Sequence, residues 1–366
     1  MNKTRLALLF GGKSPEHAIS IRSARNIFAA IDQDRFETVL IGIDPQGRWW
    51  HLPNNTLVLE TPDEEIWANG RAITLMPGYH GRPFAYLASQ DSPPAIDVVF
   101  PITHGPFGED GSLQGILRHL GLPFVGPDVL GSAVCMDKDV AKRLLLQADL
   151  LTAAYRCYHA HEKDAVDFLA VANQLGTPLF IKPANMGSSV GVRKVENKAE
   201  FDAAMEDAFR YDRKVIVEEA IVGRELECAV MGNGILASTS VGEVAMNQGF
   251  YTYEEKYDSE SEAEVLIPAP GLDDQTIAKL VLVARHAYQT LGCEGMTRVD
   301  MFLTEEGAVY VNELNTLPGF TSISMYPQLW NQAGMSYTEL ITALVELAME
   351  RAEEERKLKR SLEDFS

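Results

Sequence analysis

Short apolar runs and helical patterns alternate along the first third of the chain. Leu6–Phe10 is a continuous apolar run of the kind that forms a parallel strand buried on both faces. A helix is predicted after the next glycine turn, because apolar residues recur on one helical face: Ile21, Ala24, Phe28 and Ile31. Two more strands are predicted at Thr38–Ile43 and Asp97–Pro101. This alternation indicates a doubly wound α/β domain over residues 1–125, although residues 47–94 fit no clear pattern.

A turn rich in Gly and Pro at residues 121–127 separates this domain from a second region. We expect residues 126–218 to form a small α+β lobe whose strands make a mixed sheet. Its expected elements are a helix over Asp137–Ala148, a strand near Tyr155, a helix from about Lys163 to Leu175, and strands over Leu179–Pro183 and Val215–Glu219.

The last region, residues 219–366, combines strands with longer helices. A helix is predicted over Asp273–Leu291, and Arg298–Leu303 and Ala308–Leu314 have the pattern of a hairpin. The final helix begins near Tyr337 and carries leucines on one side: Leu340, Leu344 and Leu347. The whole pattern therefore predicts a combination of α/β and α+β regions.

The composition is that of an ordinary globular protein: of 366 residues, 46% are hydrophobic and 23% are charged. There are 52 acidic and 32 basic residues, so the formal net charge is −20. Such a surface repels phosphate backbones and anionic lipids, so we expect neither a nucleic-acid nor a membrane partner. The charge does not exclude a small anion in a cleft, where a few lysines can reverse the local field.

The cysteines and the N-terminal segment indicate the cellular compartment in which the protein works. The four cysteines are scattered and form no metal-binding pattern, so we expect reduced core residues and neither a disulfide framework nor a zinc site: Cys135, Cys157, Cys228 and Cys293. The apolar run that starts at Leu6 has only about five residues, too few for a signal-peptide core. No stretch approaches the ~18 apolar residues that span a bilayer. We therefore expect a cytoplasmic protein.

Two glycine-containing loops offer backbone N–H groups to an anion. Gly11–Ser14 lies between a strand and a helix, but it lacks the spacing of dinucleotide and P-loop sites, so a plain tight turn explains it equally well. Glu16 follows at the first turn of the helix, where an acid ordinarily complements the helix dipole. The loop after Lys182 is a stronger candidate, because two glycines and two serines, Ser188 among them, follow that lysine. Lysine charge and close backbone approach suit phosphate oxygens, and an exposed hairpin loop is the alternative.

Acidic side chains also gather on the C-terminal hairpin. Glu313 and Asn315 share a face because side chains alternate along a strand. A two-residue turn at Glu306-Gly307 would set Asp300 opposite Glu313 and a three-residue turn would not, and the sequence leaves this register open. Oxygen ligands without Cys or His favour Mg²⁺ over zinc, and Arg298 would face the same pocket. A solvated acidic face is the alternative.

Together these segments resemble the ATP-grasp enzymes and, more narrowly, the D-alanine–D-alanine ligase family. Six motifs occur in the family's order between residue 5 and about residue 330: Gly11-Gly12-x-Ser14-x-Glu16-His17, His104-Gly105-x-x-Gly108-Glu109-Asp110-Gly111, Lys182-Pro183 with Gly187-Ser188-Ser189-Val190-Gly191, Tyr253-Glu254-x-Lys256-Tyr257, Arg298-x-Asp300, and Asn312-Glu313-Leu314-Asn315-Thr316-x-Pro318-Gly319. The resemblance implies a Rossmann-like N-terminal substrate domain (1–125) followed by a two-lobed ATP-grasp fold, with a central lobe (126–218) and a C-terminal lobe (219–366) that carries the metal site and a lid loop.

The resemblance also implies a reaction. Two D-alanines are joined to D-alanyl-D-alanine, a peptidoglycan precursor, as ATP is converted to ADP and phosphate. One carboxylate is phosphorylated to an acyl phosphate, and the amine of the second D-alanine then attacks it.

The resemblance assigns most of the candidate residues to ATP and its metal ions. Lys138 and Lys182 would hold the phosphates beside the Ser188 loop, and Lys256 the transferring phosphoryl group. Two Mg²⁺ or Mn²⁺ ions would be held by three residues: Asp300, Glu313 and Asn315. The nucleoside would be bound by Glu218, Glu219, Ala220 and Ile221 at the adenine, Glu225 at the ribose and Phe250 over the base. Without the family, Lys138 is equally an exposed helix-start lysine and Glu225 a surface acid.

The resemblance places the first D-alanine at Glu16, whose carboxylate would pair with the substrate ammonium. Ser188 and Tyr257 would be its hydrogen-bonded partners, and His104 would lie near the same substrate. A histidine in a glycine-rich loop is otherwise most often a hydrogen-bonded turn residue.

The resemblance assigns four further residues to the developing oxyanion and the second D-alanine. Arg298 and the Gly319 N–H would stabilise the oxyanion, and Ser324 with Met325 would receive the second carboxylate.

The segment Phe250–Glu264 would be a lid that excludes water from the acyl phosphate. The presence of Tyr257 in this segment favours amide over ester formation. A ligase that forms the D-alanyl-D-lactate ester is the first alternative. Another ATP-grasp carboxylate–amine ligase would share the lysines, glycine loop and metal residues but not Glu16-His17. A phosphotransferase and a two-lobed binding protein are more distant alternatives, and the family expectation for assembly is a homodimer.

Overall fold

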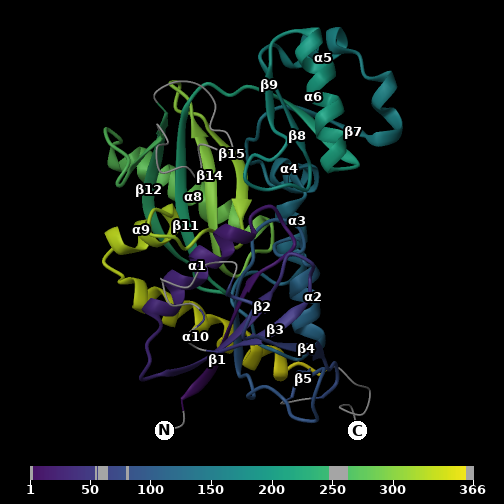
Figure 1. Cartoon of the computed structure of the whole chain (residues 1–366). Helices are drawn as coiled ribbons and strands as arrows, with labels where there is room; N and C mark the ends of the chain where they lie inside the picture. The colour runs from purple at the N-terminus through teal and green to yellow at the C-terminus, as the bar shows by residue number, and fades with distance from the viewer. Residues whose placement is uncertain (1–2, 54–55, 57–64, 80–81, 247–262, 360–366) are drawn as a thin grey trace.

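The computed structural model describes residues 3–53, 56, 65–79, 82–246 and 263–359. Within these residues the strands form three sheets, of six, four and five strands. Figure 1 shows the first sheet at the bottom of the view, the second at the upper right and the third at the upper left.

The first sheet has the strand order β5-β4-β3-β2-β1-β6. Its strands are β1 (Thr4–Gly11), β2 (Phe36–Ile43), β3 (Trp49–Leu52), β4 (Arg71–Leu75), β5 (Phe84–Tyr86) and β6 (Val98–Ile102). β1 pairs in parallel with β2 and β6, so the three predicted strands are confirmed. β3, β4 and β5 pair antiparallel and come from the segment 47–94 that had no clear pattern.

The helices of this region are α1 (His17–Ala30) and α2 (Ser112–His119). Gly11 ends β1 with φ at +89°, and a Cβ there would clash with the carbonyl oxygen of Ile43. Only glycine permits this turn, which leads the chain from the carboxyl end of β1 into α1.

The second sheet has the order β7-β10-β8-β9. The elements of this region are α3 (Val129–Met136), α4 (Lys138–Gln147), β7 (Tyr155–His159), a 3₁₀ helix (Ala160–Ala165), α5 (Phe168–Leu175), β8 (Leu179–Pro183), β9 (Arg193–Val195), α6 (Lys198–Tyr211) and β10 (Lys214–Glu219). The predicted mixed sheet is wrong, because every neighbouring pair is antiparallel. The helix predicted from Lys163 is also wrong at its start: the Asp167 side chain accepts hydrogen bonds from Leu169 and Ala170 and caps α5 there.

The third sheet, β13-β12-β11-β14-β15, is entirely antiparallel. The elements of this region are β11 (Arg224–Gly232), β12 (Ala237–Met246), β13 (Ala263–Leu266), α8 (Asp274–Thr290), β14 (Gly295–Leu303), β15 (Val309–Asn315), α9 (Met325–Gln332) and α10 (Tyr337–Arg356). The predicted helix at Asp273–Leu291, the hairpin and the final helix are confirmed.

The C-terminal helix returns to the first sheet. α10 contacts α1 and β6, and its buried Leu340 and Leu344 share one core with Leu8 and Phe100. The guanidinium of Arg351 donates to the carbonyls of Phe124 (2.7 Å) and Gly126 (2.8 Å), which fixes α10 to the turn after the first sheet. The first and third sheets are therefore packed together, while the domain limits at residues 125 and 218 stay predictions.

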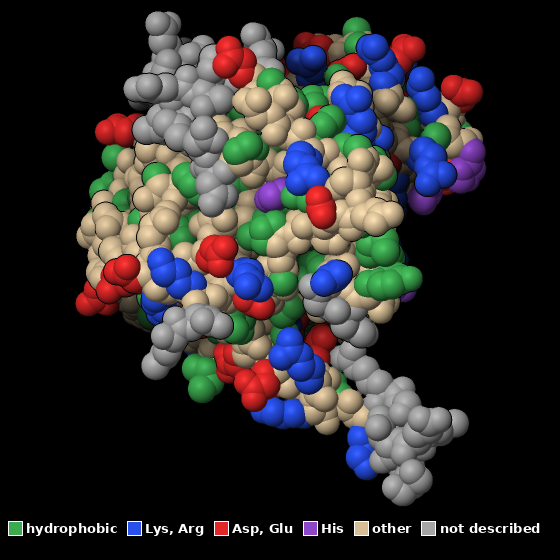
Figure 2. Space-filling model, turned by 60° about the horizontal axis from the view of Figure 1, so that its bottom comes forward, with side chains coloured by type: hydrophobic (Ala, Val, Ile, Leu, Met, Phe, Trp, Pro, Cys, Tyr) green, Lys and Arg blue, Asp and Glu red, His purple; other side chains and the backbone are tan. Residues whose placement is uncertain are grey.

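The cysteines are less scattered than the sequence indicated. The Sγ atoms of Cys135 in α3 and Cys293, after α8, lie 3.5 Å apart in the core, and both thiols are free. On the face shown in Figure 2, Lys and Arg side chains are interspersed with Asp and Glu. Among the described residues, none of the helices has the length and apolar content needed to span a bilayer.

Candidate active site

Glu16 and Ser188 meet although 172 positions separate them in sequence. Glu16 immediately precedes α1 and is 5% exposed. Ser188 lies in the loop between β8 and β9, where its φ of +49° is uncommon for a residue with a side chain. Its hydroxyl donates a short hydrogen bond to Glu16 Oε1. A Cβ on Gly105 would lie 2.6 Å from Glu16 Oε2, so a third loop also closes around this carboxylate.

The loop after β6 places His104 and Glu109 beside Glu16. His104 is buried, and its Nδ1–H donates to the carbonyl of Leu317 (3.0 Å). Burial lowers the His104 pKa, although Glu16 and the Leu317 carbonyl oppose the shift, so this imidazole is neutral at pH 7. Glu109 accepts hydrogen bonds from the N–H groups of Gly105 (2.6 Å) and Leu317 (3.2 Å). Burial and the negative charge of Glu16 raise the Glu109 pKa to about 8. Glu109 was not among the residues whose roles were predicted from the sequence.

Three lysines lie close together, and two of them pair with Glu218. Lys182 ends β8, and its Nζ lies 2.6 Å from Glu218 Oε2. Lys142, from α4, lies 2.9 Å from Glu218 Oε1 and is only 2% exposed. Lys138, also from α4, donates to the carbonyl of Met186 (2.7 Å) in the β8–β9 loop and lies 3.4 Å from Glu313. Lys138 and Lys182 thus lie in one cluster, and their role toward phosphates stays a prediction. Lys142 could not be singled out from the sequence, where it is one more lysine on a helix face.

Electrostatics explain how these buried charges coexist. Burial opposes ionisation of Glu218, but the charges of Lys142 and Lys182 outweigh it and lower the Glu218 pKa to about 2. Burial also disfavours a charged Lys182. The negative charges of Glu218, Glu313 and Glu225 outweigh this effect, so the Lys182 pKa is raised. Glu218 and Lys182 therefore favour their charged forms, whereas burial lowers the pKa of Lys142 although the charge of Glu218 opposes that shift.

The predicted adenine segment lies at the end of β10. Glu218 is buried there and directs its side chain to the two lysines, so only its main chain is available to a base. Glu219 Oε1 accepts from the Ala154 N–H (2.7 Å). Ala220 and Ile221 follow, both half-buried. Glu225, on β11, acts electrostatically on Lys182.

The hairpin β14–β15 sets Asp300 opposite Glu313 through a bulge. The Thr304 N–H donates to the Ala308 carbonyl (3.0 Å), so the turn has three residues and taken alone would oppose Asp300 to Asn312. A register shift between Asp300 and Met301 adds one residue and moves Glu313 into that place. The register that the sequence left open is thus settled by the bulge.

The side chains on this face contact one another closely. Asn315 pairs with Arg298 across the strands and donates from Nδ2 to Asp300 Oδ2 (2.8 Å). The Arg298 guanidinium makes two bonds of 2.7 Å to Asp300 and lies 2.9 Å from Glu227. Burial works against the charge on Arg298, but Asp300 and Glu227 raise the Arg298 pKa.

The donor set of this face fits a hard divalent cation. Asp300, Glu313 and Asn315 present two carboxylates and one amide oxygen from adjacent strands, without sulfur or imidazole. Within the part of the chain that the structure describes, no group of three or more His, Cys, Asp and Glu is arranged to hold a metal. A metal here would therefore use Asn315 as its third ligand.

Gly319, Ser324 and Met325 lie at the start of α9. Ser324 Oγ accepts from the Thr321 N–H (2.9 Å), and a Cβ on Gly319 would lie 2.8 Å from the same Oγ. Met325 is the first residue of α9, whose N-terminal N–H groups favour a carboxylate. The three predicted residues are thus neighbours. Phe250, Lys256 and Tyr257 lie outside the described residues, as does most of the predicted lid.

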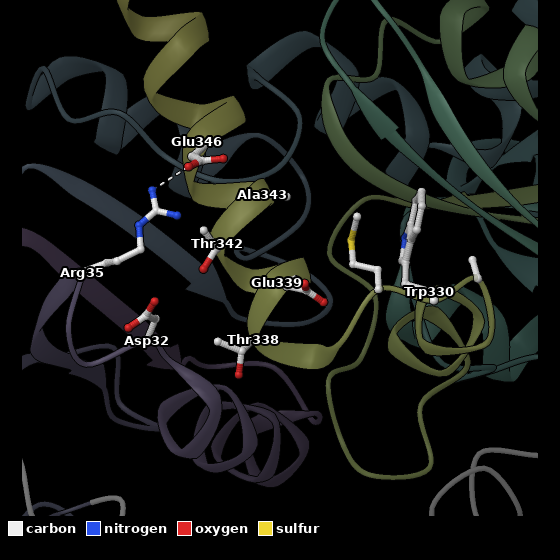
Figure 3. Close-up of a pocket in the computed structure, with 11 residues that line it drawn as sticks. Asp32, Arg35, Trp330, Thr338, Glu339, Thr342, Ala343 and Glu346 are labelled. Atoms are coloured by element: carbon white, nitrogen blue, oxygen red, sulfur yellow. Dashed lines mark hydrogen bonds and ion pairs between the residues drawn. The ribbon is translucent and has the colours of Figure 1, made fainter.

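A separate pocket of about 530 Å³ lies between the α1–β2 connection and α10. Figure 3 shows Asp32 and Arg35 on one side and α10 on the other, and Arg35 pairs with Glu346 at 2.6 Å. None of the predicted site residues lines this pocket.

Comparisons with known proteins place this chain in a family. The two models of the D-ala D-ala ligase family, N-terminus and C-terminus, match residues 5–127 and 144–346. A D-alanine–D-alanine ligase from Shouchella clausii is 51% identical over 368 residues, with 100% of both chains covered. D-alanine–D-alanine ligase A from Chromobacterium violaceum is 50% identical over 364 residues, with 99% of each covered.

Solved structures show the same relation. The D-alanine–D-alanine ligase of Coxiella burnetii superposes with a TM-score of 0.87 at 35% identity, covering 98% of this chain and 97% of that one. The VanG D-Ala:D-Ser ligase of Enterococcus faecalis gives 0.84 at 37% identity, covering 95% and 100%. The protein described here is a member of the D-alanine–D-alanine ligase family, with the ATP-grasp fold of its structural neighbours.

Proposed function

We propose that this enzyme joins two D-alanines to D-alanyl-D-alanine, converting one ATP to ADP and phosphate. The first carboxylate takes the γ-phosphoryl group to give an acyl phosphate and ADP. The amine of the second D-alanine attacks that carbonyl carbon, and phosphate leaves with one oxygen of the original carboxylate. The dipeptide would serve as a peptidoglycan precursor.

The proposal is supported above all by one loop that contacts both a buried carboxylate and a cluster of lysines. The β8–β9 loop contacts Glu16 through Ser188 and receives Lys138 at Met186. A buried carboxylate for an ammonium thus lies on one side of the loop and a lysine cluster for phosphates on the other. A substrate that binds Glu16 by its ammonium can present its carboxylate toward the transferring phosphate.

Phosphoryl transfer depends mostly on positioning and charge neutralisation. Lys138 and Lys182 would bind the phosphates of ATP, and Asp300, Glu313 and Asn315 would hold two Mg²⁺ or Mn²⁺ ions. Bound there, these ions would neutralise part of the negative charge of the phosphates.

The second half-reaction develops an oxyanion on the attacked carbonyl. Arg298 and the Gly319 N–H would stabilise it, since fixed donors act strongly in a site closed to water. Ser324 and the N-terminus of α9 at Met325 would bind the carboxylate of the second D-alanine. Neutral His104 would lie beside the first substrate and hold the Leu317 carbonyl in place.

Three finer properties complete the proposal. The 51% identity to a D-alanine–D-alanine ligase supports D-alanine as the second substrate over D-lactate or the D-serine in the name of the VanG enzyme. The use of ATP supports a cytoplasmic reaction. The proposal of a homodimer is supported by the family resemblance alone, and the molecular mass measured by sedimentation tests it.

Phosphate release with Mg-ATP, measured with single D- and L-amino acids, tests the proposal. We expect release that requires D-alanine and rises with its concentration. D-lactate and D-serine, each added with D-alanine, measure the choice at the second position by the ratio of mixed to plain product. Release without an amino-acid requirement, or a mixed product in excess near neutral pH, would contradict the proposal.

A further inference from the structure

We propose that Glu109 is a positioning residue, which sets the place of the Gly319 N–H by joining the N-terminal loop around His104 to the C-terminal loop before α9. The inference rests on the proposed function, because it concerns the loop that would stabilise the oxyanion. Glu109 would act through this loop and not through a contact of its own with the substrate.

The contacts of Glu109 span the two loops. Its Oε2 accepts from the Gly105 N–H at 2.6 Å, within its own loop. Its Oε1 accepts from the Leu317 N–H at 3.2 Å, 208 positions further along the chain. One side chain therefore satisfies a backbone donor on each side of the boundary between the first and third sheets.

The same N-terminal region holds the chain on both sides of Gly319. On one side, the Leu317 peptide is fixed at its N–H by Glu109 and at its carbonyl by His104 Nδ1 (3.0 Å). On the other side, the Phe320 N–H donates to Ser23 Oγ (3.2 Å). Only Pro318 and Gly319 lie between these anchored peptides, so a shift of Leu317 is transmitted to the Gly319 N–H.

The residue type matters because both contacts need an acceptor. Each oxygen of a carboxyl group keeps acceptor capacity, whether the group is charged or carries one proton. Glutamine has the same shape but replaces one oxygen with an NH₂ donor, which would face a backbone N–H. The Glu109→Gln variant therefore loses one of the two contacts and leaves a backbone donor unpaired.

The neighbouring Asp110 provides a matched control. Its carboxylate accepts from the Phe107 N–H and the Ser112 N–H, both at 2.9 Å and both inside the same loop. Asp110→Asn thus makes the same chemical change one residue away, without affecting a contact to the C-terminal loop.

The test compares both variants with the parent enzyme in kcat, in KM for ATP, and in the affinity of a phosphinate analogue of the tetrahedral intermediate. For Glu109→Gln we expect kcat to fall by between about 10- and 100-fold, because small misplacements of catalytic groups cost that much. Analogue affinity should fall by a similar factor, while KM for ATP stays within about twofold. Asp110→Asn should retain kcat and analogue affinity.

Other outcomes bear on the inference separately from the proposed function. Equal effects of the two variants, or a Glu109→Gln loss confined to KM for ATP or to thermal stability, would overturn it. If Glu109→Gln does not fold, Glu109→Asp is judged by the same criteria, since its shorter side chain cannot reach both N–H groups. A parent enzyme without D-alanine-dependent phosphate release would instead refute the proposed function.

Discussion

Replacing Lys142 by methionine tests whether the buried lysine–glutamate network orders the nucleotide site. Methionine keeps most of the side-chain volume but removes the charge that lies 2.9 Å from Glu218. Glu218 then keeps Lys182 as its remaining ion-pair partner at 2.6 Å. We expect a less stable central region and a Lys182 that is held more tightly by Glu218 and is less available to a phosphate.

The magnitude follows from the burial and the pKa of this cluster. The displacement of the Glu218 pKa from 4.5 to about 2 corresponds to roughly 3 kcal/mol in favour of the charged form. Removing one partner of a buried pair costs about 3–5 kcal/mol. Because Lys182 remains, we expect the lower end, about 3 kcal/mol, and up to a tenfold rise in KM for ATP.

Hydrogen exchange of the β8 and β10 amides measures the local free energy of opening, and steady-state kinetics measure KM for ATP. The control is Arg143→Met, one residue along the same helix, whose side chain is 63% exposed and pairs with Asp139. Because the Arg143 side chain is mostly exposed, its pair with Asp139 contributes at most about 1 kcal/mol, so this control should leave KM for ATP unchanged. Equal exchange and equal KM in the two variants would show that Lys142 does not order the nucleotide site.

Three further predictions concern the substrate, metal and acid responses. Gly105→Ala forces a side chain at φ +71° to within 2.6 Å of Glu16 Oε2, so KM for D-alanine should rise at least about tenfold. The control Gly115→Ala has open space around it, so it should keep the parent kinetics and gain about 0.5–1 kcal/mol of folding stability. Unchanged kinetics in Gly105→Ala would contradict the placement of the first substrate. Glu313→Gln should raise the Mg²⁺ concentration for half-maximal activity at least about tenfold, as measured by Mg²⁺ titration, and an unchanged requirement would exclude Glu313 as a ligand. The lowered Glu218 pKa contributes stability that is complete above pH 4.5 and is lost as the pH falls toward 2, so urea unfolding at stepped pH should show this loss, and a flat profile would contradict it.

The sequence predicted elements best where the pattern was long and regular. β1, α1 and α8 have continuous apolar runs or many helical turns, and they lie where the pattern placed them. β3, β4 and β5 have only three to five residues each, so they show too few alternations to be distinguished from loops. The prediction that the second sheet is mixed was wrong. Neighbouring strands need not be consecutive in sequence, so the order of strands along the chain does not give the direction in which they pair.

The candidate site was predictable where family motifs mark it, and less so where packing decides. Glu16, Ser188, Lys182 and the hairpin acids were identified from motifs, and the structure brings them into two neighbouring clusters. Lys142 reads as one more charge on a helix, and nothing in the sequence indicates that Glu218 lies beside it. The bulge that aligns Asp300 with Glu313 was likewise invisible, because it depends on how the two strands pair.

The net charge of −20 is consistent with an anionic substrate at one protected place. Lys138, Lys142, Lys182 and Arg298 all come from elements that border the candidate site. Acidic partners hold each of them in place, so the local field results from fixed pairs and not from overall composition.

Transfer of oxygen from the substrate carboxylate to phosphate distinguishes ligation through an acyl phosphate from any route that bypasses it. D-alanine labelled with ¹⁸O in both carboxylate oxygens is incubated with Mg-ATP and the enzyme, and the released phosphate is analysed by mass spectrometry. An acyl phosphate intermediate predicts one ¹⁸O in each phosphate and one dipeptide for each ADP. Phosphate without ¹⁸O, while the dipeptide still forms, would contradict it.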